Sequence, residues 1–178
     1  MAHPAIDLVR QVLPPPSAGG DLIDWEGLAR STGWEFPADY KDFVEIYGGG
    51  EIDEYLSVET PPVEGSPYGR LLEGADPALP SDCRVELAPG LPPGEELRLL
   101  PFGATATGDV VFWLVEELPE KWRVAIFRRQ SPYGMKRWSI FDGGMADFLH
   151  ALLAGSLEPF SQDFSDGQPH TYVSWRDA

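Results

Sequence analysis

The sequence predicts an α+β fold, with an antiparallel meander sheet of about five or six strands and helices packed on one face. Apolar side chains recur at helical spacing through the first 50 residues and again near residues 144 to 154. Between residues 97 and 141 lie four short segments rich in β-branched and aromatic residues, separated by short polar breaks. Helices followed by a run of strands and a closing helix, without βαβ alternation, indicate this class.

The first two helices are expected before residue 34. Residues 3 to 13 carry apolar side chains on one side, and the prolines at 14 to 16 end that helix because they lack backbone donors. Asp21 can cap the next helix, in which Trp25 should be buried, and Gly33 is placed to end it.

A third helix is expected from Pro37, whose fixed φ suits a first turn, with Tyr40 and Phe43 on its apolar face. Its other face carries Asp39, Asp42 and Glu45, which we expect to be exposed. The glycines at 48 to 50 supply the positive φ that closes a helix and lets the chain reverse.

Strands are expected from there on. Residues 55 to 60 alternate as a strand with one buried face does, whereas 61 to 93 form an irregular insertion rich in proline and glycine. Segments 97 to 103, 109 to 116, 122 to 129 and 136 to 141 form the meander. A helix at 144 to 154 covers one side, and the aromatic tail 155–178 docks on the body, with an added edge strand at 170 to 175.

Length and composition favour one domain over residues 1–178, with a core at about 22–154. We find no apolar run that would span a membrane and no secretory signal. The chain has one cysteine, which fits a reducing compartment. We therefore expect a cytoplasmic protein that does not bind membranes.

Charge is unevenly distributed along a chain whose formal net charge is −16. Residues 21 to 54 hold ten acids against two bases, while residues 121 to 137 hold six bases and no acid. Acidic character disfavours nucleic acid and favours basic protein partners, although it also serves solubility alone. The acids that we expect to face a basic partner are Asp39, Asp42, Glu45, Glu51, Asp53 and Glu54.

The basic run suggests a second surface. Its bases could project from one hairpin and bind nucleic acid or an acidic peptide, pair with the acidic helix of a second copy in a homo-oligomer, or pair within the molecule. Self-association is favoured over nucleic acid, because the charge of the whole molecule opposes the latter. The residues concerned are Arg123, Arg128, Arg129, Lys136 and Arg137.

Catalytic chemistry has little support in the sequence. The three histidines show no metal-ligand spacing, and Cys83 lies in the irregular insertion without a nucleophile signature. We expect no cofactor, no metal and no enzyme activity. Asp109, which follows Gly108 between two strands, is predicted to stabilise a turn through nearby backbone N–H groups.

Several motifs resemble the SUKH superfamily, which includes fungal Smi/Knr cell-wall-synthesis regulators and many bacterial immunity proteins. FPADYKDFVEIYGGG, LLPFG, GDVVFWL and the closing DFLHALL are similar to its signatures in order and spacing, across most of residues 22 to 154. The insertion, the tail and Gly48, where the family often has Asn, depart from the pattern. The motif positions, expected to be structural, are Trp25, Pro37, Tyr40, Phe43, Gly48, Gly49, Gly50, Phe102, Gly103, Gly108, Asp109 and Phe148.

The resemblance implies a binding module, and bacterial members of the superfamily are similar to immunity proteins that bind and neutralise toxins delivered between competing cells, many of which are nucleases. An acidic inhibitor can place carboxylates where a basic nuclease expects phosphates. Two alternatives stay open: a regulatory scaffold like the fungal relatives, and a hydrolase with an unrecognised pair of carboxylates.

Overall fold

The computed structural model describes residues 2–74, 81–91, 97–158, 160, 164 and 169–178. The helices in this part are α1 (Pro4–Val12), α2 (Trp25–Thr32), α3 (Ala38–Tyr47), α4 (Ser81–Leu87) and α5 (Met145–Leu153), with 3₁₀ turns η1 (Leu71–Gly74), η2 (Ala88–Gly90) and η3 (Pro119–Lys121). The strands are β1 (Gly50–Ile52), β2 (Leu56–Val58), β3 (Leu99–Thr105), β4 (Val110–Leu114), β5 (Arg123–Phe127), β6 (Trp138–Phe141) and β7 (Tyr172–Ser174).

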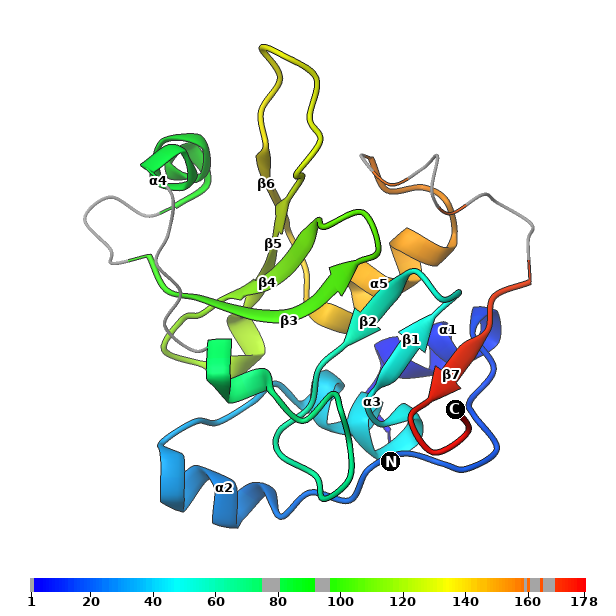
Figure 1. Cartoon of the computed structure of the whole chain (residues 1–178). Coiled ribbons are helices and arrows are strands. Elements are labelled where there is room, and N and C mark those ends of the chain that lie inside the picture. The colour runs from blue at the N-terminus through cyan, green and yellow to red at the C-terminus, as the bar shows by residue number, and fades with distance from the viewer. Residues whose placement is uncertain (1, 75–80, 92–96, 159, 161–163, 165–168) are drawn as a thin grey trace.

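Within the described residues the strands form one antiparallel sheet in the order β6-β5-β4-β3-β2-β1-β7 (Figure 1). The predicted α+β meander is confirmed, and the sheet has seven strands where about five or six were expected. The unforeseen strand is β1, which starts at the third glycine of the triplet and pairs with both β2 and β7.

Two apolar clusters lie on the two faces of the sheet. Val124 and Ile126 of β5 belong to the larger cluster, together with Phe43 of α3 and Phe148 of α5. Ala125, between them in the strand, belongs to the smaller cluster, which includes side chains of α4. The three helices α1, α3 and α5 thus share one face, as predicted, and the short helix α4 from the insertion packs on the other.

Helix α2 begins three residues later than predicted. Its N-cap is Asp24, whose Oδ1 accepts a hydrogen bond from Gly27 N at 2.9 Å, and not Asp21. Gly33 ends the helix at φ 76°, as expected. Trp25 is half-buried, not fully buried as predicted, and its ring packs on those of Phe36 and Tyr40.

The C-terminal segment docks on the body. Phe160, Phe164 and Tyr172 are buried, and β7 joins the sheet beside β1, so the predicted edge strand is confirmed. In the ranges that the structure describes, no helix has both the length and the apolar character that crossing a bilayer requires.

Candidate functional site

Asp39 is buried, so its predicted place on an exposed helix face is wrong. Its Oδ2 accepts a hydrogen bond from Ala146 N at 2.9 Å, and its Oδ1 accepts one from Tyr40 N at 2.8 Å. Ala146 lies in the first turn of α5, whose N-cap is Gly144, which has no side chain to cap with. Asp39 therefore supplies from α3 the acceptor that an N-cap residue normally supplies.

Burial raises the pKa of Asp39 above its usual value, while its two backbone donors oppose that shift. The same contact explains Gly144, since a Cβ there would lie 2.8 Å from Asp39 Oδ2. This carboxylate holds two helices together and is not available to a partner.

Asp53 joins the β1–β2 turn to the C-terminal segment. Its Oδ2 lies 2.6 Å from His170 Nδ1, and its Oδ1 accepts a hydrogen bond from Thr171 N at 2.8 Å. The other ring nitrogen of His170 lies 2.8 Å from Leu153 O at the end of α5. Asp53, predicted to face a partner, is thus half-buried and part of a three-way structural contact.

Asp42 and Glu51 are also half-buried and engaged. Asp42 accepts a hydrogen bond from the backbone N–H of His3, which precedes α1. Glu51 Oε1 accepts one from Tyr68 OH at 3.1 Å.

Glu45 and Glu54 are the members of the predicted acidic set that remain exposed with no hydrogen bond or ion pair of their side chains to any described residue. Glu45 is on α3, and Glu54 lies in the β1–β2 turn. The structure therefore does not assemble the six carboxylates into one open surface, because four of them bind groups of the fold.

Asp21 is the buried acid whose role sequence reasoning missed. Its Oδ2 accepts a hydrogen bond from Gly49 N at 2.8 Å, and its Oδ1 accepts one from Trp175 Nε1 at 3.1 Å. Arg176 Nη1 lies 2.5 Å from Oδ1 and also donates to Gly20 O. Asp21 thereby ties the C-terminus to the loop that follows α3.

Each glycine of the triplet is required for a different structural reason. All three were expected to supply a positive φ, but among them only Gly48 has one, at 69°, which strains any residue with a Cβ. A Cβ on Gly49 would lie 2.7 Å from Tyr68 Cβ, and one on Gly50 would lie 2.3 Å from Val173 O. The triplet is thus a structural junction, where the loop after α3, β7 and the insertion come into close contact.

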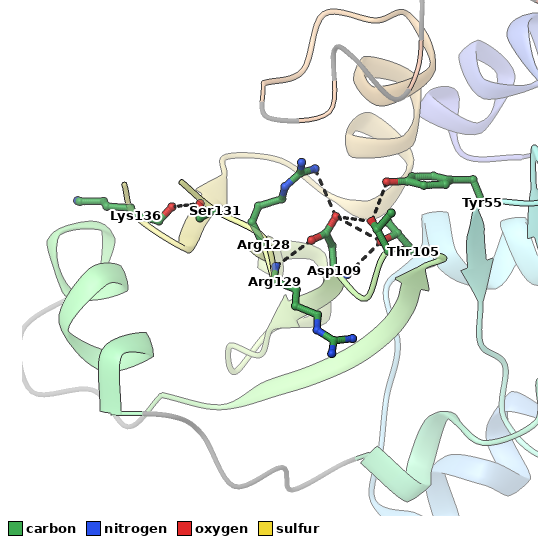
Figure 2. Close-up of polar contacts among 8 residues, drawn as sticks. Tyr55, Thr105, Asp109, Arg128, Arg129, Ser131 and Lys136 are labelled. Atoms are coloured by element: carbon green, nitrogen blue, oxygen red, sulfur yellow. Dashed lines mark hydrogen bonds and ion pairs between the residues drawn. The ribbon is translucent and has the colours of Figure 1, made fainter. Parts of the chain in front are cut away.

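Asp109 reaches beyond its own turn (Figure 2). Its Oδ2 accepts hydrogen bonds from the hydroxyls of Thr105 and Thr107, at 3.3 and 3.2 Å. Its Oδ1 accepts one from Arg129 N at 2.8 Å, and Arg128 Nη1 lies 3.4 Å from Oδ2. One buried carboxylate therefore links the β3–β4 turn to the end of β5.

Two further bases of the predicted second surface have internal partners. Arg123 forms an ion pair with Glu116 at 3.1 Å. Arg137 lies 3.9 Å from Asp82 of α4 and places its guanidinium over the Phe127 ring. Glu116 lies in the β4–β5 connection and Asp82 in α4, so neither of these partners belongs to the acidic stretch 21–54.

The connection between β5 and β6 projects from the body (Figure 1). At its tip Tyr133 is fully exposed and Met135 is 65% exposed, and the side chains of Arg129 and Lys136 are exposed as well. Part of the predicted basic surface is therefore available for contacts.

In the part of the chain that the structure describes, no group of three or more His, Cys, Asp or Glu side chains could hold a metal ion. Cys83 is buried, and burial raises the pKa of its thiol to about 11, which disfavours the reactive thiolate.

Two hollows of the surface were not predicted. A cleft of about 700 Å³ lies between the residues after α2 and the β4–β5 connection, where the Arg98 guanidinium lies over the Trp34 ring. A smaller cavity of about 220 Å³ is lined by Glu59, Arg70, Leu71, Glu73, Pro101, Gly103, Ala104 and Val110. The alternation in residues 55 to 60 places Glu59 opposite the core side, but only the fold shows that η1 encloses it.

Comparisons of the chain with protein-family models, with curated proteins and with solved structures return no match.

Proposed function

We propose that this chain is a non-enzymatic, cytoplasmic binding protein of immunity type, which sequesters a basic protein such as a nuclease toxin. The observation that carries the proposal is a net charge of −16 together with exposed carboxylates that bind nothing else in the described chain. These carboxylates belong to Glu35, Glu45, Glu54, Glu64, Glu73, Glu117, Asp142 and Asp147.

A field of this kind accelerates the approach of a cationic partner and opposes nucleic acid. Outward carboxylates can form charge-assisted hydrogen bonds with arginine and lysine side chains at little cost, because they are not already committed to the fold. The 700 Å³ cleft adds aromatic surface from Trp34, a residue type enriched in binding hot spots.

The regulatory scaffold and the hydrolase remain alternatives. A hydrolase would need a carboxyl group with a raised pKa in a cavity, and Glu59 is such a group because its burial raises its pKa. Turnover of a glycan or an ester by the purified protein would favour that reading.

Co-expression tests the proposal. If a neighbouring reading frame encodes a secreted toxin, its C-terminal domain should arrest growth alone and fail to do so when this chain is present, and the two should copurify. Continued arrest together with no complex would refute the proposal. Growth rescue without a complex would point to an indirect, regulatory role.

A further inference from the structure

The cavity beside η1 has a charged side and an apolar side. Leu71, Pro101 and Val110 supply much of its apolar lining. Its acidic lining residues are Glu59, whose side chain is 19% exposed, and Glu73, which is exposed. A volume of about 220 Å³ is of the size of one large amino-acid side chain.

The charges of this cavity do not balance. Arg70 Nη2 lies 3.5 Å from Glu59 Oε1, and the side chain of Arg70 is 65% exposed. Glu59 Oε2 is buried and has no hydrogen-bond partner among the described residues. Glu73 adds a second carboxylate whose charge raises the pKa of Glu59, although burial is the larger cause. The lining thus holds two carboxylates and one guanidinium, which is paired with Glu59, and this leaves one negative charge for a further cation.

We infer that this cavity is a socket for an arginine side chain of a basic protein partner, with Glu59 and Glu73 as its anionic ligands. The inference rests on the proposed function only for the source of that arginine. The socket itself follows from the cavity, the uncompensated charge and the unpartnered oxygen.

An arginine side chain matches both sides of the cavity. Its aliphatic stem can pack on the apolar lining, while its planar guanidinium offers donors in a fork that suits carboxylates. An ammonium group would bring the same charge without the forked geometry. A guanidinium that binds here stabilises the ionised form of Glu59, so its affinity should increase as the pH rises.

The test uses the full chain and N-acetyl-arginine methylamide, followed through backbone amide shifts in NMR. We expect saturable shifts at Glu59, Leu71 and Ala104, with an affinity in the millimolar range that increases with pH. The citrulline analogue, which has the same shape without the charge, should cause no saturable shift. Equal binding of both probes, or no binding of either, would overturn the inference.

Matched variants locate the contact. Glu59→Gln should weaken binding of the arginine probe at least about tenfold, which is a loss of roughly 1.4 kcal/mol, and Glu73→Gln should weaken it to a smaller extent. Glu26→Gln removes an exposed carboxylate of α2 outside the cavity lining and should change nothing. Equal losses in all three would mean that net charge alone attracts the probe. A positive titration with no growth rescue would support the socket while refuting the toxin partner.

Discussion

Three aspartates are buried in the described structure, Asp21, Asp39 and Asp109. Moving a carboxylate out of water is costly unless donors replace the lost solvent, and each of the three accepts hydrogen bonds from other parts of the fold. These three carboxylates therefore connect segments of the fold that are distant in sequence. The charge that can act on a partner belongs to the exposed carboxylates, which are mostly glutamates.

Asp39→Ala should destabilise the protein by about 1–3 kcal/mol, because Ala146 N at the start of α5 loses its buried acceptor. The matched control is Glu45→Ala on the exposed side of the same helix, with an expected change within about 0.5 kcal/mol. Urea unfolding measures both. Equal effects would contradict the capping role of Asp39.

Glu59→Gln should change how stability depends on pH. Burial raises the pKa of Glu59 in the folded state, so its contribution is fully present below the unfolded pKa of about 4.3 and is lost as the pH rises through the raised pKa. The variant does not titrate there. The free energy of unfolding of the variant relative to the wild type should therefore increase from pH 4 to pH 7, as measured by urea unfolding. A constant difference would show that the pKa is not raised.

The placement of Asp39 could not be predicted from its own helix. Helical spacing separates the side of Tyr40 and Phe43 from the side of the acids, but it does not show that the N-terminus of α5 lies against the first turn. Glu59 directly follows β2, and the alternation in residues 55 to 60 places it away from the core side. Its cavity depends on η1 and β3, which come from distant sequence.

At the scale of elements, the junction at the glycine triplet joins β1, β7 and the loop after α3. Gly49 N donates to Asp21, and Tyr172 OH donates to Gly48 O. These contacts hold the C-terminal segment against the body, so loss of one should loosen the whole segment.

Gly50→Ala should cost more stability than Gly33→Ala. The first places a Cβ 2.3 Å from Val173 O, which forces β7 away from β1. Gly33→Ala places a Cβ on a residue at φ 76°, where it meets nothing within 4 Å, so we expect a loss of stability of about 1 kcal/mol. Urea unfolding compares the two.

Amide hydrogen exchange shows where the Gly50→Ala substitution loosens the structure. The amides of Asp53 and Trp175, which donate across this junction, should lose protection in Gly50→Ala and keep it in Gly33→Ala. Unchanged protection in both variants would refute the close approach of β7.

The meander was predictable because β3, β4, β5 and β6 are each dense in β-branched and aromatic residues and follow one another closely. Strand β1 could not be predicted, since its three residues, Gly50–Ile52, are too few for a periodic signal. It exists because strands pair with it on both sides, one of them from the far end of the chain. Asp21 was misassigned for the same kind of reason, because its partners lie more than 25 residues away.

At the scale of the whole molecule, the acidic and basic segments do not neutralise each other. The ion-pair partners of Arg123 and Arg137 are Glu116 and Asp82, so the exposed glutamates of residues 35 to 54 keep their charge. The surface combines a strongly acidic field with one projecting basic hairpin.

Association with a basic partner should slow steeply as salt rises, because screening shortens the range of this field to about 8 Å at physiological ionic strength. Surface plasmon resonance at several salt concentrations measures the association rate. A rate that does not depend on salt would mean that the acidity plays no part in recognition.

The most direct measurement of the central claim is growth rescue by a Glu45→Lys/Glu54→Lys variant, scored beside the wild type in cells that produce the toxin domain. Both side chains are exposed and bind nothing in the described fold, so the variant should unfold at the same urea concentration as the wild type, within error. The account predicts that the wild type restores growth and the variant, though folded, does not. Full rescue by the variant would contradict recognition through the outward carboxylates.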